Sequence, residues 1–520
     1  MRKLINPDEG VAAPLGQEAV QTPSVVATVV STAPDQAEKQ YNKRGHKWTP
    51  AYVFPKQYKV WLRLTRFEPS TEKPLHWRVE SLDNAFDPLE RSVTKPRDPR
   101  GFLVDLPAPG RIKIGARIGK SQTPIVREIN VRDYLIASIG DSFSSGQGNP
   151  DADGVPSEGS RAVCEATTLY KLVAELHAEL LDVPLLGDAV GMFEDVADSI
   201  KDITCSVIGL FGADCDDVSL RPESPPEWLE PKAWRSLKSA PALAAHSLGD
   251  ANSGRLVTFV SVASSGAEVD SGLLKPQRSF QKAGQIDELV ALLRDRGDRG
   301  DNPQLKRPID VLVMSIGGND VGFAGTLSDM TKNVNFIGRL GTAGASRDEI
   351  KRDVRAEIAK LPAKYDKVAK VIQERLRPGA VVVLEYPTPL FDGNNGKPAE
   401  GCGLFKVDSA ITTSALAITE NEAGDIETLG NELNAVVREA ASRHGWFYVD
   451  GISDRFKQHG YCSSESWYVF AEDSCNRQGD LEGMLHPNES GTKAAASLLK
   501  KEINGILNQL GNDTGDGKFA

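Results

Sequence analysis

The sequence lacks long hydrophobic runs. No uninterrupted apolar stretch reaches the roughly 18 to 20 residues that a helix needs to cross a bilayer, so we expect no transmembrane segment. The first residues, MRKLINPDEGVAAPLGQEAVQ, carry two basic side chains but no apolar segment behind them, and as they stand they are not a secretory signal. Three alternatives follow: the protein stays inside the cell, it is exported by another route, or a leader has been cut from it.

Clusters of basic residues are also missing. The chain has 72 acidic against 61 basic side chains, which gives a net charge of -11. No group of Lys and Arg stands out that could neutralise a phosphate backbone. We therefore expect no nucleic-acid partner.

The cysteines lack the spacings of metal sites. No C-x-x-C pair and no Cys/His set with zinc spacing occurs, which argues against a bound metal. Their even number, and the short separations of Cys205 from Cys215 and of Cys462 from Cys475, suit disulfide bonds in an oxidising compartment. Six thiols are equally ordinary in a cytosolic chain of this length, so both interpretations stay open. The six cysteines are Cys164, Cys205, Cys215, Cys402, Cys462 and Cys475.

With 520 residues, the chain is longer than one compact core needs. Changes in its hydrophobic pattern divide it into segments. Residues 1–44 have no sustained period and predict a disordered or extended leader. Residues 45–131 hold short alternating segments such as QYKVWLRLTRF and GRIKIGARIG, which predict a small antiparallel β-sandwich domain. Residues 132–510 form a third segment with a different pattern, and residues 511–520 predict a flexible tail.

Residues 132–510 alternate buried apolar strands with helical segments. The strands read YLIASIG, LVTFVSVAS, IDVLVMSIGG, AVVVLEYP and GWFYVDG, and QIDELVALLRDRG is typical of the helices between them. Strands that are apolar on both faces and linked by helices indicate a parallel sheet covered on both sides. The sequence therefore predicts a three-layer α/β domain.

An insertion over about residues 150–232 interrupts this alternation. Within it, the segment from LYKLVAELHAELL to CSVIGLF carries apolar residues at helical spacing. Two hypotheses remain open for this insertion. It is either a pair of helices packed on the domain, or a lid that lies beside a site and contacts lipid.

One strand ends in a turn suited to catalysis. In IASIGDSFSSGQG the apolar run stops at Gly-Asp-Ser, which presents Ser142 beyond the carboxyl edge of the sheet, where such sheets bind ligands. A serine hydroxyl needs a base to take its proton. Of seven histidines, His486 lies in a Gly/Pro/Asn-rich loop, GMLHPNESG, which could present its imidazole. The other six have contexts that favour packing or surface roles: His46, His76, His177, His246, His444 and His459.

Two more strand ends could supply hydrogen-bond donors for an oxyanion. VASSGAEV stops at Gly266, where a glycine lets a backbone N–H approach a substrate oxygen, and VMSIGGNDVGF offers the side-chain amide of Asn319. Taken singly, each of these motifs is more often just a turn.

Together and in this order, the segments IGDSFSSGQGNP, SSGAEV, IGGNDVGF and LHPNESG resemble the four blocks of the SGNH or GDSL hydrolase superfamily. The resemblance covers residues 131 to about 505, with the insertion unmatched. It implies a flavodoxin-like α/β/α sandwich that needs no metal and no organic cofactor. It also implies that Ser142 is the nucleophile and His486 the base. The oxyanion would then be held by the backbone N–H groups of Ser142 and Gly266 and by the side chain of Asn319.

The sequence departs from the family pattern beside the histidine. Most members place an Asp three residues before it to orient the imidazole, and Gly483 occupies that position here. We therefore expect a dyad of Ser142 and His486 with a main-chain carbonyl as the orienting group, and keep Asp480 as a weaker candidate. The turn is also not the G-x-S-x-G elbow of α/β-hydrolases.

These observations predict a carboxylic-ester hydrolase that works through an acyl-enzyme on fatty-acyl esters or phospholipids, with transient contact to a membrane surface. Removal of acetyl groups from carbohydrate would use the same residues with a smaller acyl pocket. From another class, the chain could be a binding or adhesion protein on a degenerate hydrolase scaffold. The cysteine pairs and the usual location of the family's members favour a secreted or periplasmic protein, whereas the lack of a recognisable secretory signal favours the opposite.

Overall fold

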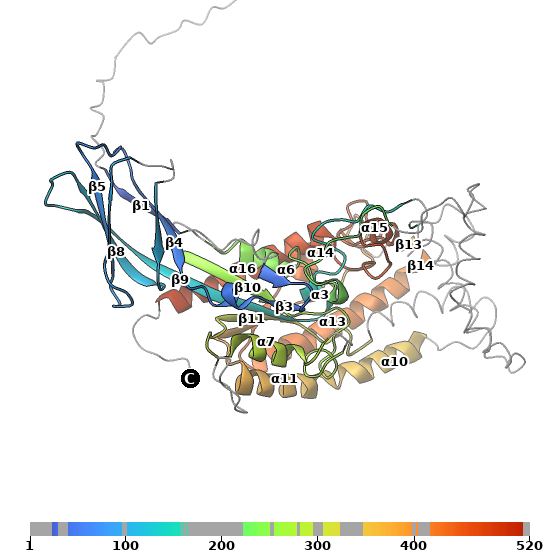
Figure 1. The fold of residues 1–520 in the computed structure, drawn as a ribbon. Helices are drawn as coiled ribbons and strands as arrows, with labels where there is room; N and C mark the ends of the chain where they lie inside the picture. Colours follow the sequence, from blue (N-terminus) through green and yellow to red (C-terminus); the bar gives the residue numbers. More distant parts are fainter. Residues whose placement is uncertain are drawn as a thin grey trace, which may run out of the picture. The chain divides into compact units, whose positions relative to one another are not determined.

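The structure is a computed structural model of the chain (Figure 1). It describes residues 23–29, 40–95, 101–157, 160, 164, 222–249, 254–277, 281–294, 305–322, 347–397, 402–403 and 417–512. Most of the insertion predicted over residues 150–232 lies outside these residues, so its helices and its role as a lid stay predictions. No helix among the described residues is both long enough and apolar enough to cross a membrane.

The chain divides into two compact units. One comprises the described parts of Met1–Ser31, Lys56–Arg132 and Asp250–Arg255, and the other those of Thr32–Pro55, Asp133–Gly249 and Leu256–Ala520.

The first unit is all-β. One antiparallel sheet has the order β1 (Val25–Val29), β4 (Tyr58–Leu64), β7 (Phe102–Leu106). The other antiparallel ribbon contains the first half of β9 (Ile125–Gly140), β8 (Gly110–Ile118), β5 (Leu75–Ser81) and β6 (Leu89–Val93). Alternate residues of β4, β5 and β8 are buried, which gives each sheet one apolar face. The all-β region that the sequence predicts is therefore present.

Two segments differ from the predicted division. β1 lies in the stretch predicted as a leader, because the alternating VVATV pairs with β4 and buries Val25, Ala27 and Val29. Residues 45–55, assigned by the sequence to the β-sandwich, belong to the second unit.

The second unit is built on a parallel sheet. Its strands are the second half of β9, β10 (Arg255–Ser261), β11 (Val311–Ser315), β12 (Ala380–Leu384) and β15 (Phe447–Val449). β9 pairs in parallel with β11, β11 with β12 and β12 with β15, while β10 pairs with the other side of β9. Numbered along the chain from β9, the order is 2-1-3-4-5, which is flavodoxin-like and confirms the predicted fold class.

Helices cover both faces of this sheet (Figure 1). α7 (Gln285–Leu293), α10 (Arg347–Ile358), α11 (Leu361–Arg375) and α13 (Glu420–Arg443) lie on one face, and α6 (Ala240–His246), α14 (Ile452–Phe456) and α16 (Glu489–Asn512) on the other. The remaining elements are β2 (Tyr41–Asn42), β3 (Lys47–Trp48), α2 (Pro50–Val53), α3 (Ser142–Ser145), the 3-10 helix η3 (Pro231–Ala233), β13 (Cys402–Gly403), β14 (Ala417–Ile418) and α15 (Ala471–Arg477).

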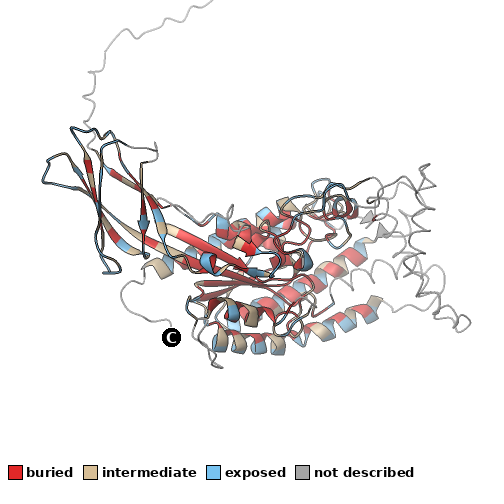
Figure 2. Ribbon diagram, in the orientation of Figure 1, coloured by how far each residue is buried: buried red, intermediate tan, exposed pale blue. Residues whose placement is uncertain are grey.

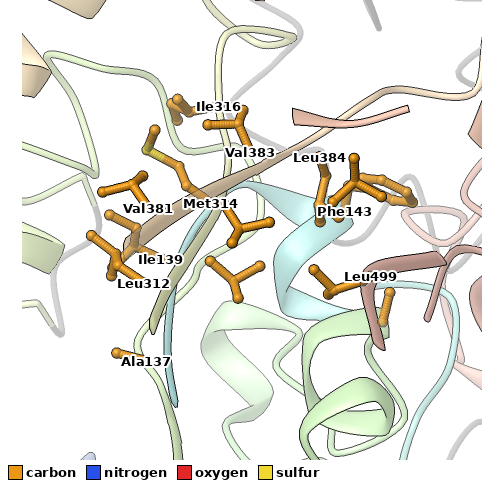
Figure 3. Packing of buried hydrophobic residues seen from close by; sticks show 14 of the residues in the cluster. Ala137, Ile139, Phe143, Leu312, Met314, Ile316, Val381, Val383, Leu384 and Leu499 are labelled. Atoms are coloured by element: carbon orange, nitrogen blue, oxygen red, sulfur yellow. The ribbon is translucent and has the colours of Figure 1, made fainter. Parts of the chain in front are cut away.

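Sequence periodicity explains how these helices pack. α13 buries Ile426, Leu433 and Val437 on one stripe, and a capping box of Thr419 and Glu422 begins it. Figure 2 shows that the strands of this sheet and the helix faces turned toward it are buried. The buried cluster includes side chains of β9, β11 and β12 together with Phe143 and Leu499, and Leu384 of β12 lies beside Phe143 (Figure 3).

Aromatic side chains cover the free edge of β10, which explains why residues 45–55 join this unit. The Tyr52 hydroxyl donates to the Phe259 carbonyl (3.0 Å) and accepts from the Phe259 N–H (3.2 Å), and Trp48 Nε1 donates to the Ser261 carbonyl (2.9 Å). These bonds replace the ladder that an unpaired edge strand lacks. Trp48 and Tyr52 stack at 5.3 Å between ring centroids and are buried.

A disulfide joins Cys164 to Cys475, which are 311 positions apart in sequence, with 5.7 Å between their Cα atoms. Cys462 is also disulfide-bonded, and none of the described cysteines is free. The suggested pairing of Cys462 with Cys475 is therefore wrong, because the fold brings the start of the insertion beside α15.

The turn that ends β9 requires a glycine at position 140. Gly140 has a φ of 122°, and a Cβ there would lie 2.0 Å from the Ser315 carbonyl oxygen of the neighbouring strand. Gly140→Ala is expected to lower the free energy of unfolding by at least about 2 kcal/mol, because neither backbone can move without breaking the sheet. The matched control is Gly424→Ala in α13, where a Cβ meets nothing within 4 Å. This control should be neutral or more stable by about 0.5–1 kcal/mol.

Urea unfolding of both variants, followed by tryptophan fluorescence, measures these changes. A Gly140→Ala protein as stable as the wild type would contradict the close contact between β9 and β11.

Candidate active site

Three loops leave the same edge of the parallel sheet. The Asp141 N–H donates to the Ser315 carbonyl at the end of β11 (2.9 Å), and the Ser264 N–H donates to the Gly140 carbonyl at the end of β9 (3.0 Å). The loops that carry Ser142, Gly266 and Asn319 therefore begin side by side. In an order of 2-1-3-4-5 this edge is the switch point where ligands bind.

Ser142 is the first residue of the short helix α3 and is half-buried. Asp141 caps this helix, accepting from the Phe143 N–H (3.1 Å), and Gly146 ends it with a φ of 91°. A strand, a glycine and a one-turn helix thus set Ser142 at the edge of the sheet. Its backbone N–H makes no hydrogen bond with another described residue.

Asp141 is buried and accepts three hydrogen bonds. Besides the Phe143 N–H, its donors are the hydroxyls of Ser315 (2.6 Å) and Tyr386. Burial raises the pKa of Asp141 to about 6, and the three donors oppose that rise. The Tyr386 hydroxyl also accepts from the Gly318 N–H (3.3 Å), so one network joins the turn of Ser142 to the loop of Asn319. Sequence reasoning missed Tyr386.

His486 is half-buried and held by main-chain groups on both sides. Its Nδ1 lies 3.2 Å from the Met484 carbonyl, its N–H donates to the Gly483 carbonyl (3.2 Å), and its own carbonyl accepts from the Val469 N–H (2.8 Å). Leu485 before it has a φ of 64°, a conformation that L-residues seldom adopt and that often occurs at functional sites.

The contact with Met484 assigns the tautomer of His486. Nδ1 faces a carbonyl and must carry the proton, which leaves Nε2 with a lone pair that can accept one. Burial lowers the pKa of His486 to about 4, although the carbonyls of Met484 and Gly483 oppose the shift. The ring is therefore neutral at neutral pH.

Gly266 and Asn319 occupy the loops after β10 and β11. Gly266 has a φ of 73°, its carbonyl accepts from Gln277 Nε2 (2.6 Å), and its N–H bonds to no other described residue. Asn319 is half-buried, and its Nδ2 donates one hydrogen to the Ala267 carbonyl (3.0 Å). A side-chain amide has two N–H groups, so a second donor remains on Asn319.

Asp480 has hydrogen-bond partners other than His486. Its Oδ1 accepts from Gln478 Nε2 (2.7 Å) and from the Glu482 N–H (2.9 Å), and burial raises its pKa. Among the described residues, no hydrogen bond joins Asp480 to His486, whose Nδ1 faces Met484 instead.

The loop after Ser142 packs directly against the loop of His486. A Cβ on Gly148 would lie 3.3 Å from the Cβ of His486, and Asn149 Nδ2 donates to the Pro487 carbonyl (2.7 Å). Ser142 and His486, 344 positions apart, therefore lie on adjoining loops. No group of three or more His, Cys, Asp or Glu residues suited to a metal occurs in the described part of the chain.

The low pKa of His486 predicts a specific titration. In a two-dimensional ¹H–¹³C NMR titration, the imidazole signal that His486→Gln removes should shift near pH 4. A histidine in the unfolded chain titrates near pH 6.5. The unfolded state therefore binds more protons between about pH 4 and 6.5, and His486 makes the folded state less stable as the pH falls through that window. A midpoint near 6.5 for this signal would contradict the lowered pKa of His486.

Comparison with known proteins gives one family. The model of the GDSL-like lipase/acylhydrolase family matches residues 232–494, which begin after the insertion and contain Gly266, Asn319 and His486. Lipase 1 of Streptomyces coelicolor is 27% identical over 159 residues, which are 30% of this chain and 48% of that protein. A lipase of Streptomyces rimosus is 26% identical over 160 residues, 30% of this chain and 49% of that protein. The chain thus spans about half the length of the curated relatives it matches.

Among solved structures, the extracellular lipase from Streptomyces rimosus is 20% identical, with a TM-score of 0.37 over 72% of this chain and 99% of that one. Because the family match extends over half of the 520 residues, the resemblance seen in the sequence is confirmed, and the chain belongs to the GDSL-like lipase/acylhydrolase family.

Proposed function

We propose that this protein is a serine hydrolase that cleaves carboxylic esters through an acyl-enzyme on Ser142. The observation that carries the proposal is the state of His486: neutral, with Nδ1 on the Met484 carbonyl, on a loop packed against the one that follows Ser142. Membership of the family and the lipase names of the two relatives support the same reaction class.

The first half of the reaction forms the acyl-enzyme. His486 Nε2 takes the proton of the Ser142 hydroxyl as Oγ attacks the ester carbonyl. The tetrahedral oxyanion accepts hydrogen bonds from the N–H groups of Ser142 and Gly266 and from the Asn319 amide. When the intermediate collapses, the imidazolium passes its proton to the leaving alkoxide, and the acyl group stays on Ser142. In the second half, His486 takes a proton from a water molecule as the water oxygen attacks the acyl carbonyl. The second tetrahedral intermediate then breaks its bond to Ser142 Oγ, the imidazolium returns the proton to that oxygen, and the carboxylic acid is released.

The catalytic unit in this proposal is a dyad oriented by a main-chain carbonyl. Met484 supplies the acceptor that an aspartate gives in a triad, and Asp480 keeps its own partners. Lipase-type substrates with longer acyl chains are favoured over acetyl esters by the activities named for the relatives.

Single substitutions test the roles of these residues. On p-nitrophenyl butyrate, Ser142→Ala and His486→Ala should each lower kcat by about 10⁴-fold or more, and Asn319→Ala by about 10²- to 10³-fold. Ser121→Ala and His76→Gln in the all-β unit are matched controls and should keep wild-type rates. A Ser142→Ala protein as active as the wild type would refute the nucleophile.

Acyl-chain preference tests the substrate class. Rates for p-nitrophenyl esters from acetate to palmitate should peak beyond acetate, because a lipase-type site gains binding energy from apolar acyl carbons. A strict preference for acetate would instead support the carbohydrate acetylesterase alternative. A wild-type protein inert on every ester would favour a binding or adhesion protein on a hydrolase scaffold.

A further inference from the structure

The side chain of Gln147 connects three parts of the site. Gln147 follows α3, five residues after Ser142, and only 3% of its surface is exposed. Its backbone N–H donates to the Ser142 carbonyl (3.3 Å), which fixes the start of its side chain relative to the serine. Both ends of its amide are used, and they reach two different loops.

One end reaches the strand end that precedes Gly266. The Ser265 hydroxyl donates to Gln147 Oε1, and Ser265 is buried. The backbone of Ser265 is held separately, because its N–H donates to the Ala233 carbonyl (3.1 Å). The peptide that carries the Gly266 N–H therefore has its preceding residue fixed by Gln147 on one side and by η3 on the other.

The other end reaches the loop of His486. Gln147 Nε2 donates to the Glu482 carbonyl. The next carbonyl, of Gly483, accepts from the His486 N–H, and Met484 holds His486 Nδ1. Gly483 is closely packed, since a Cβ there would lie 3.1 Å from Gly148 Cα and 2.7 Å from Gln478 Oε1.

At neutral pH the amide of Gln147 can make both bonds at once, whereas an ionised carboxylate cannot. One end must accept from a hydroxyl while the other donates to a carbonyl; the bond to Ser265 is buried and the bond to Glu482 is partly buried. A carboxylate has no hydrogen to donate, and a methionine of similar length has neither group. Loss of the bridge removes the side chain that ties the Glu482 carbonyl to the loop of Ser142, so the loop of His486 is expected to move.

We propose that Gln147 is the positioning residue that holds the His486 loop and the Gly266 peptide in register with Ser142. This inference rests on the proposed function, since it assigns Gln147 a role in that reaction. Gln147 touches no reacting atom and acts through the backbone on either side of it. Its loss should therefore lower kcat more than it raises KM, because misplaced groups cost transition-state stabilisation.

The test compares Gln147→Met, Gln147→Glu and Ser265→Ala with the wild type and with Thr258→Val. Thr258 is buried in β10, where its hydroxyl donates to Asp133 Oδ1 (2.8 Å), so this control removes one partly buried hydrogen bond away from the site. Each protein is titrated with a p-nitrophenyl phosphonate that labels the reactive serine, and rates are expressed per labelled site. This correction removes any loss caused by misfolded protein.

We expect Gln147→Met to lower kcat by about 30-fold or more with a KM change below about threefold, and Thr258→Val to keep the wild-type kcat. Ser265→Ala should cost less, and Gln147→Met combined with Ser265→Ala no more than Gln147→Met alone, because both changes break the same bridge. The protonated form of Gln147→Glu can donate to Glu482 again. Its rate relative to the wild type should therefore rise about fivefold or more from pH 8 to pH 5.

Failure of the inference and failure of the proposed function give different results. An active wild type, with Gln147→Met within twofold of it per labelled site, overturns the role of Gln147 alone. A Gln147→Glu ratio that stays flat with pH does the same, even if Gln147→Met does not fold. A wild type that hydrolyses no ester, or an unimpaired Ser142→Ala, overturns the proposed function and this inference with it.

Discussion

The buried carboxylate of Asp141 is the constraint on which the site depends. It follows the Gly140 turn and is bound by donors from three places: its own helix, Ser315 at the end of β11, and Tyr386 after β12. Burial disfavours the charge, as the pKa of about 6 records, so the charged form needs all three donors in place. The donors that satisfy Asp141 also fix the serine turn against the sheet, because the cap and Ser142 are adjacent.

The loop of residues 146–149, which follows this turn, holds the next part of the site in place. Gln147 and Asn149 bind main-chain carbonyls of the His486 loop, and Gly148 allows the two backbones to approach closely. Side chains that bind carbonyls fix a loop without depending on its side chains. The His486 loop therefore takes its position from the serine loop, although it arrives from the far end of the chain.

Local pattern was enough to predict the sheet and the strand-end residues. Apolar runs that stop at glycine marked Ser142, Gly266 and Asn319, and parallel strands place such ends at one edge. The bonds between loops could not be predicted, because Gln147 meets partners 118 and 335 residues away and no local signal encodes that register. The disulfide between Cys164 and Cys475 could not be predicted for the same reason. Nor could the contact of Trp48 with β10, because the local sequence gives Trp48 the same pattern as any aromatic residue in a β-strand.

Because the partner of His486 is a main-chain carbonyl, the equilibrium between its neutral and charged forms differs from that of a triad histidine. A carboxylate beside the ring would favour its charged form and raise its pKa, whereas the Met484 carbonyl orients the ring with only a partial charge. The ring then stays in the form that accepts protons well below neutral pH, yet its cation is poorly stabilised once formed. In the proposed reaction, more of the transition-state charge must therefore be stabilised on the oxyanion side, where donor placement has a large effect on rate. The position of the Gly266 N–H should therefore affect the rate more here than in a site with a full triad, and so should the hydrogen bond from Ser265 to Gln147 beside it.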